Sequence, residues 1–249
     1  MKIIVLAIKF EYNGIEQIIN PVIIQDDSHM ILIDAGYPCQ FELFEAAAKK
    51  SDIDLNKLSH IIITHHDFDH IGSLAEFKKR FPHIQILSSS IEKAYIEKHK
   101  KPLRLEQAEK RYPFLSDNDK QQALIFHKIL ENIEGVEVDD ILHNHQILPI
   151  GEGVEVIFTP GHTQGHISLY IKENKTLITG DVLVLVNDKL VIPYPEFAYN
   201  LAQAQSSIKN LMNYEIDEMI CYHGGSYKGN WQDILILDND LIENSLTQA

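Results

Sequence analysis

A run of six residues, His65–His70, contains three histidines and two aspartates and follows directly on the apolar segment HIIIT. Imidazole and carboxylate groups are common protein ligands of divalent transition metals. Four other predicted strands also end in an Asp or a His: Asp34 follows ILI, His162 follows VEVIF, Asp181 ends LITGD and His223 ends MICYH. Loops at the ends of strands converge in α/β folds, so this pattern predicts a metal site.

The spacing within the run indicates more than one ion. In an extended or turning loop, alternate side chains point the same way, so His65 and Asp67 could reach one ion while Asp69 and His70 reach a second. A single tetrahedral zinc has four ligands, fewer than the chain offers. Two ions roughly 3.5–4 Å apart and bridged by a hydroxide would use all the candidates, which are His65, Asp67, Asp69, His70, His162, Asp181 and His223.

The segments around these residues alternate between short strands and helices. Apolar, β-branched runs predict strands in the first half: KIIVLAIKF, QIINPVII, MILIDAG, HIIIT and IQILSSS. FELFEAAAKK and GSLAEFKKRF have the spacing of helices. Further strands are predicted at HQILPI, VEVIFTP, HISLYI, KTLITGD and EMICYHG, with a helix at NLAQAQSSIKNLMNY and a helical stretch from about Trp231. The pattern favours one α/β domain over residues 1–249.

A helical region at residues 91–133 separates the two halves and is expected to be an insertion. It contains the aromatic residues Tyr95, Tyr112, Phe114 and Phe126, which favour either extra packing or a lid over the metals. The basic run KHKKPLR at 98–104 is interpreted as a solvated surface, because it is flanked by Glu92, Glu97, Glu106 and Glu109.

Composition and charge exclude several classes of function. The net charge of −14 and the absence of a dense Lys/Arg run argue against a nucleic-acid partner. Cys39 and Cys221 are too few for a disulfide framework. The opening segment lacks the features of a signal peptide, and no apolar run has the length of a membrane span. We expect a cytoplasmic protein that acts on a small molecule without nucleic acid or membrane; the aromatics of the insertion are compatible with a homodimer.

Taken together, HHDFDH, PGHTQGH, TGD and YHGG resemble the ordered motifs of the metallo-β-lactamase superfamily of binuclear metal hydrolases. Its signature is H-x-H-x-D-H after a strand, followed by a Gly-His-Thr-type histidine, an Asp at a strand end and a late His. The resemblance extends from Leu32 to His223. It implies a four-layer αββα sandwich, with residues 91–133 as a helical insertion.

The resemblance also implies a role for each ligand, and two divalent metal ions as cofactors. We expect zinc, with manganese or iron as alternatives. The first metal would be held by His65, Asp67 and His162, the second by Asp69, His70 and His223, and Asp181 would bridge them. Behind the ligands, Asp34 resembles the family's supporting Asp and His166 a structural histidine.

Asp67 departs from the family pattern, which has a histidine at this position. Two divalent ions, three aspartates and one hydroxide sum to zero charge, whereas a histidine would leave a net charge of +1. We therefore expect Asp67 to raise the pKa of the bound water and to favour harder ions. Two metals are still expected to bind.

The resulting hypothesis is hydrolysis of an ester, thioester or lactone by a metal-bridging hydroxide, with Asp69 as the catalytic residue that steers the proton. Val184 stands where related lactonases carry a tyrosine, which disfavours a homoserine-lactonase. The rival is a diiron oxidoreductase related to flavodiiron proteins, which place a carboxylate at the position of Asp67. A phosphodiesterase and a non-catalytic metal-binding protein are further alternatives.

Other histidines are interpreted as surface or packing residues. His66 occupies the variable position of the motif and is not expected to touch the site. His143 and His145 are expected to lie in a turn before a strand. No role is assigned to His29, His83, His99 and His127.

Overall fold

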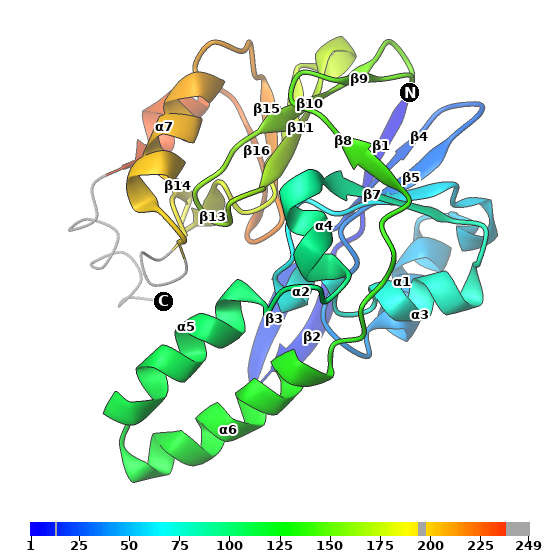
Figure 1. The fold of residues 1–249 in the computed structure, drawn as a ribbon. Coiled ribbons are helices and arrows are strands. Elements are labelled where there is room, and N and C mark those ends of the chain that lie inside the picture. The colour runs from blue at the N-terminus through cyan, green and yellow to red at the C-terminus, as the bar shows by residue number, and fades with distance from the viewer. Residues whose placement is uncertain (13, 194–197, 238–249) are drawn as a thin grey trace.

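Two six-stranded sheets face one another and form the centre of the molecule (Figure 1). The computed structural model describes residues 1–12, 14–193 and 198–237. In the first sheet the strands lie in the order β1 (Lys2–Val5), β4 (Val22–Gln25), β5 (Met30–Ile33), β6 (His60–Ile62), β7 (Gln85–Ser89) and β8 (Asp140–Leu142). From β5 to β8 neighbouring strands are parallel, so their carboxyl ends lie along one edge.

The second sheet is mostly antiparallel. Its order is β16 (Gly225–Lys228), β15 (Glu218–Cys221), β12 (Thr176–Ile178), β11 (Ile167–Ile171), β10 (Val154–Phe158) and β9 (Ile147–Leu148). Only β12 and β15 pair in parallel within it. Smaller sheets are formed by β13 (Val184–Val186), β14 (Lys189–Val191) and β17 (Leu235–Ile236), and by the hairpin of β2 (Ile8–Tyr12) and β3 (Ile15–Ile19).

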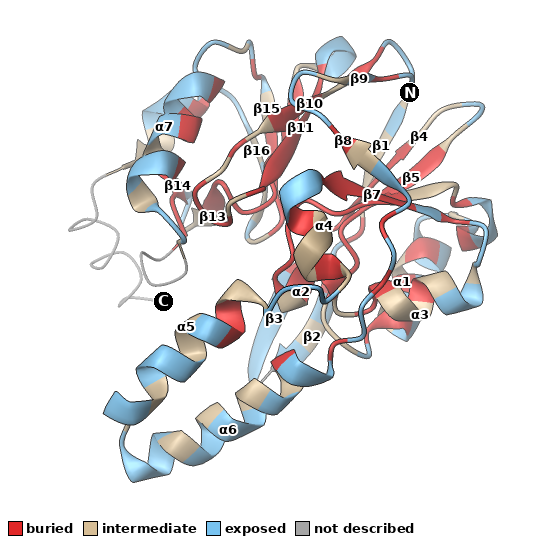
Figure 2. Ribbon diagram, in the orientation of Figure 1, coloured by how far each residue is buried: buried red, intermediate tan, exposed pale blue. Residues whose placement is uncertain are grey.

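The strands are apolar on both faces because each sheet is covered on both sides. Along β4, Val22 and Ile24 lie in the core between the sheets, and Ile23 lies in a separate core on the outer face. The helices α1 (Phe41–Lys50) and α3 (Leu74–Arg80) cover that outer face, and α7 (Leu201–Leu211) covers the second sheet (Figure 2). The fold is therefore the four-layer αββα sandwich that the sequence predicted.

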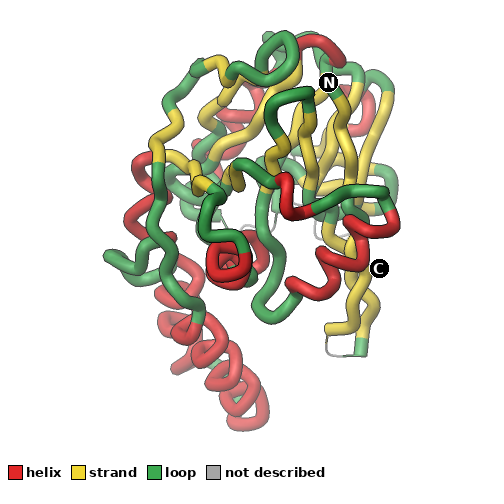
Figure 3. The backbone as a smooth tube through the Cα atoms, turned by 90° about the vertical axis from the view of Figure 1, so that its right-hand side faces the viewer, coloured by secondary structure: helices red, strands yellow, loops and turns green. Residues whose placement is uncertain are grey.

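The insertion forms α4 (Ser90–Ile96), α5 (Leu103–Arg111), a 3-10 turn (Tyr112–Phe114) and α6 (Asp117–Asn132). Helices α5 and α6 form a hairpin that projects from the body of the molecule (Figures 1 and 3). Leu105 and Leu130, at the inner ends of the two helices, belong to the core outside the first sheet. Residues farther along the hairpin are mostly exposed or half-buried.

Three predicted elements were wrong in detail. QIINPVII is not one strand, because its first half ends β3 of the hairpin and its second half begins β4 of the first sheet. KIIVLAIKF is not one strand: the chain leaves the first sheet after β1 and continues as β2 in the hairpin. The helix predicted from Trp231 is a single 3-10 turn (Trp231–Ile234) followed by β17, and its remainder from 238 onwards lies outside the described residues. No helix in the described part of the chain is long and apolar enough to cross a membrane.

Candidate metal centre

The loop after β6 carries four of the seven predicted ligands. His65 follows the strand, Asp67 has extended backbone directly before the short helix α2 (Phe68–Ile71), and Asp69 and His70 lie within that helix. All four side chains are buried, His65 and His70 completely. The change from extended to helical backbone at Asp67 separates the two pairs of ligands.

The first cluster consists of His65, Asp67 and His162. His162 Nε2 lies 3.1 Å from Asp67 Oδ2, and His65 Nε2 lies 3.8 Å from the same oxygen. His162 reaches the cluster from the loop between β10 and β11. This cluster therefore joins the two sheets.

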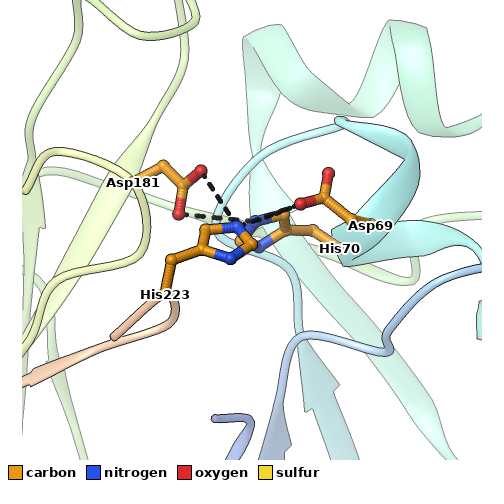
Figure 4. Close-up of side chains that lie close together, drawn as sticks. All are labelled: Asp69, His70, Asp181 and His223. Atoms are coloured by element: carbon orange, nitrogen blue, oxygen red, sulfur yellow. Dashed lines mark hydrogen bonds and ion pairs between the residues drawn. The ribbon is translucent and has the colours of Figure 1, made fainter. Parts of the chain in front are cut away.

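The second cluster consists of Asp69, His70, Asp181 and His223 (Figure 4). His223 Nε2 lies 3.0 Å from Asp69 Oδ2 and 3.6 Å from Asp181 Oδ2, and His70 Nε2 lies 3.5 Å from Asp181 Oδ1. Asp181 Oδ2 is also 3.8 Å from His162 Nε2 of the first cluster. Asp181 thus lies between the clusters, at the place expected of a bridging ligand.

The donor set fits divalent cations. His65 Nε2, His70 Nε2, Asp67 Oδ1 and Asp181 Oδ1 are buried and have no hydrogen-bond partner within the described ranges. Buried polar atoms without partners are costly, and a cation shared among them would remove that cost. The structure therefore gathers all seven predicted ligands into two sites that suit two metal ions.

Arg104 is a polar neighbour of the first cluster that the sequence did not reveal. It extends from α5, and its Nη2 donates to Asp67 Oδ2 over 2.5 Å. Arg104 is 9% exposed, so the interpretation of residues 98–104 as a solvated surface was wrong for this residue. The insertion thereby places a fixed cation on the one ligand that departs from the family pattern.

This contact changes the charge count made from the sequence. When the Arg104 guanidinium is counted, the net charge of the metal centre becomes +1, which is the value expected with a histidine at position 67. Burial alone would raise the pKa of Asp67, but the Arg104 guanidinium and His162 hold it well below its ordinary range. The expectation that Asp67 makes the centre more neutral left out the charge of Arg104. The centre is therefore no longer expected to raise the pKa of the bound water.

Asp34 and His166 support ligands from behind. Asp34 Oδ2 lies 2.9 Å from His70 Nδ1, which directs Nε2 of that ring into the second cluster. The backbone N–H of Asp181 donates to His166 Nε2 over 2.9 Å. Burial, with the nearby His162, lowers the pKa of His166 to about 3, so the ring is neutral and Nε2 is free to accept. Both residues lie where the resemblance placed them.

Glu92 is a second buried group that sequence reasoning missed. It is 0% exposed and was interpreted as part of a solvated flank of the basic run, which is wrong. Its carboxylate accepts hydrogen bonds from the backbone N–H of His66, from Thr163 Oγ1 and from the backbone N–H of Gly165, and it pairs with the His66 ring. Glu92 thus ties the loop of His65–His70 to the loop of His162. No local pattern marks it, because its partners are distant in sequence.

His66 itself belongs to this support and to neither cluster. Its ring stacks on Tyr95 with centroids 4.0 Å apart, and its Nε2 accepts from the backbone N–H of Leu103 over 3.3 Å. His143 and His145 lie in the turn after β8, as predicted. Also outside both clusters are His29, His83, His99 and His127.

Comparison with known proteins assigns the chain to a family. The model of the metallo-beta-lactamase superfamily matches residues 14–223. A metallo-beta-lactamase family protein of Thermus thermophilus superposes with a TM-score of 0.72 over 99% of this chain and 80% of its own, at 17% sequence identity. That likeness concerns the fold.

Curated relatives are similar at higher identity. Probable metallo-hydrolase YflN of Bacillus subtilis is 28% identical over 228 residues, which cover 84% of this chain and 81% of YflN. Hydroxyacylglutathione hydrolase GloC of Haemophilus influenzae is 29% identical over 160 residues, which cover 64% of this chain and 63% of GloC.

Proposed function

Because the chain belongs to the metallo-β-lactamase superfamily, a superfamily of metal-dependent hydrolases, we propose that it cleaves an ester, thioester or lactone of a small molecule with two divalent metal ions. The observation that supports this most directly is the pair of buried His/Asp clusters that meet at Asp181. Zinc is the metal proposed, because imidazole and carboxylate ligands in small sets suit it.

Two divalent cations in these sites would activate water as the nucleophile and polarise the carbonyl of the substrate. The first would be held by His65, Asp67 and His162, and the second by Asp69, His70 and His223, with Asp181 between them. This requires ionised carboxylates. Burial would raise the pKa of Asp181, but His223 and His70 hold it well below its ordinary range.

Asp69 is the residue proposed to take the proton of the attacking water. It is the most exposed of the three ligand carboxylates, at 8%, and one oxygen contacts His223 at 3.0 Å. Its backbone carbonyl accepts a 2.6 Å hydrogen bond from the Tyr222 hydroxyl, which fixes this turn of α2. Asp69 therefore combines a fixed position with the largest exposure of the three ligand carboxylates.

The relatives support the substrate class. YflN is named a probable metallo-hydrolase, and GloC is named for an acylglutathione, which is a thioester. One observation favours a second candidate, a diiron oxidoreductase: the first cluster contains the carboxylate of Asp67 beside two histidines. Iron content and the absence of hydrolysis would identify that case.

The test is a panel of a thioester, a lactone, an aryl ester and a phosphodiester, assayed with protein purified without chelator. We expect turnover of a carbonyl substrate that is lost on changing Asp181 to Asn. Asp188→Asn, in the turn between β13 and β14, is the matched control and should keep full activity. Absence of turnover on every member of the panel, with metal bound, would contradict the proposal.

A further inference from the structure

A cavity of about 550 Å³ lies between the two helices of the insertion hairpin. Arg104, Ala108 and Arg111 line it from α5, and Ala123, Phe126 and His127 line it from α6. These positions recur at three- and four-residue spacing, so they form one face of each helix. The two faces enclose a space that the hairpin does not fill itself.

Two lining residues connect the cavity to the metal centre. Arg104 lines the cavity and also donates to Asp67 of the first cluster. Phe126 packs edge-on against Phe68, with ring centroids 5.4 Å apart, and Phe68 lies between Asp67 and Asp69 in the ligand loop. The inner end of the cavity therefore adjoins the loop that carries four metal ligands.

The walls define the chemistry of an occupant. The alanines and Phe126 are apolar, and the aliphatic stem of Arg111 extends the apolar wall while its charge can remain in water. His127 is one of the lining residues, and its Nε2 is buried and has no hydrogen-bond partner in the described part of the chain. Such an atom calls for a polar atom of a ligand. The apolar walls and this ring nitrogen together favour an occupant with a long apolar part and an oxygen atom.

We infer that the cavity between α5 and α6 binds the acyl group of the substrate, an elongated apolar chain that carries a carboxyl or carbonyl oxygen. This rests on the proposed hydrolysis and names its substrate class. The volume lies within the range of about 300–1,000 Å³ that is typical of small-molecule sites. The scissile bond would lie at the metals while the chain extends outwards between the helices. The insertion thus selects substrates by the length of the acyl group.

The test fills the cavity and measures binding separately from turnover. Ala123→Phe places a ring in the cavity, and Leu124→Phe is the matched control, because Leu124 is 47% exposed on the same helix and is absent from the lining. Binding of decanoate is measured by calorimetry on the metal-loaded protein. Hydrolysis of p-nitrophenyl decanoate is compared with that of p-nitrophenyl acetate. Circular dichroism and thermal unfolding check that both variants fold.

We expect wild type and Leu124→Phe to bind decanoate, and Ala123→Phe to bind it at least about tenfold more weakly, since the buried part of the chain is displaced. We also expect kcat/KM for the decanoate ester to fall about tenfold in Ala123→Phe, with the acetate ester within about twofold of wild type. Should Ala123→Phe misfold, Ala108→Phe serves the same purpose from α5.

The inference is overturned if wild type does not bind decanoate, or if the cavity-filling variant binds it as well as the control does. An equal fall in kcat/KM for both esters in Ala123→Phe would overturn it as well, because the acetate ester is too short to reach the cavity. If neither ester is cleaved, the proposed function fails for esters while the calorimetry still decides whether the cavity binds an acyl chain.

Discussion

Changing Arg104 to Met should destabilise the metal-free protein, because it removes the guanidinium from a buried carboxylate. Arg104 and Asp67 are 9% and 4% exposed, and their contact is 2.5 Å. Methionine keeps the apolar stem against the hairpin but leaves Asp67 with His162 as its remaining polar partner at 3.1 Å. Breaking one side of a buried ion pair costs about 3–5 kcal/mol.

We expect a loss of roughly 3 kcal/mol, the lower end of that range, because the contact with His162 remains. For a chain of this length each kcal/mol lowers Tm by about 2–4 °C, so Tm should fall by roughly 6–12 °C. The assay is thermal and urea unfolding of chelator-treated protein. Arg111→Met, on the exposed part of the same helix, is the control and should change stability by less than about 0.5 kcal/mol.

A double-mutant cycle isolates the pair. Asp67→Asn and Arg104→Met should each destabilise the metal-free protein, and the double variant should lose at least about 1 kcal/mol less than the sum, because neither charge is then left unpaired. Added metal should restore more stability to Arg104→Met than to wild type, since a cation at the first cluster replaces the missing guanidinium. An Arg104→Met variant within about 1 kcal/mol of wild type, together with an additive cycle, would refute the reasoning.

Three further predictions follow from the same geometry. Asp181→Asn should reduce the rate of hydrolysis at least about 100-fold and lower the amount of bound metal, since loss of even a residue behind the metal ligands reduces metal affinity or activity about 10–100-fold. Metal analysis and kinetics check this, and an unchanged metal content and rate would contradict it. Glu92→Gln should cost about 3 kcal/mol in urea unfolding, because it breaks the buried pair with His66. Burial would raise the pKa of Glu92, but His66 keeps it lowered. The stability that its charge contributes is therefore present above the ordinary glutamate pKa and is lost as the pH falls. A destabilisation by Glu92→Gln that stays the same down to pH 4 would contradict this. Finally, Ellman's reagent at pH 8 should modify Cys39, which is exposed, and spare Cys221, whose pKa burial raises to about 12; two rapidly reacting thiols in the folded protein would contradict this.

The ligands were predictable because each follows a short apolar strand. His65–His70 follows β6, and Asp181 and His223 lie just beyond β12 and β15, which pair in parallel. Such strand ends meet at one edge of a sheet, so the spacing along the chain already indicates proximity. The apolar runs likewise marked the strands, whereas the four-layer arrangement was implied by the resemblance of the ordered motifs to a known family.

Arg104 and Glu92 could not be found in this way. Each lies in a polar, helical stretch that resembles a solvated surface, and each contacts a residue more than 25 positions away. Only the packing of the insertion against the ligand loop reveals them. The break of KIIVLAIKF has a similar origin: the segment is apolar throughout, and its two halves separate because they pair with β4 and β3 in different sheets.

The central claim, a binuclear hydrolase, is tested most directly by titrating chelator-treated protein with zinc while following hydrolysis of the best substrate in the panel. The account predicts that the rate rises until two equivalents of metal per chain are bound and then stops rising. Saturation at one equivalent would show that Asp67 and Arg104 leave the first cluster without a metal. A protein that binds two equivalents but cleaves no substrate would contradict the hydrolase, and two irons in the protein as isolated would then favour the oxidoreductase.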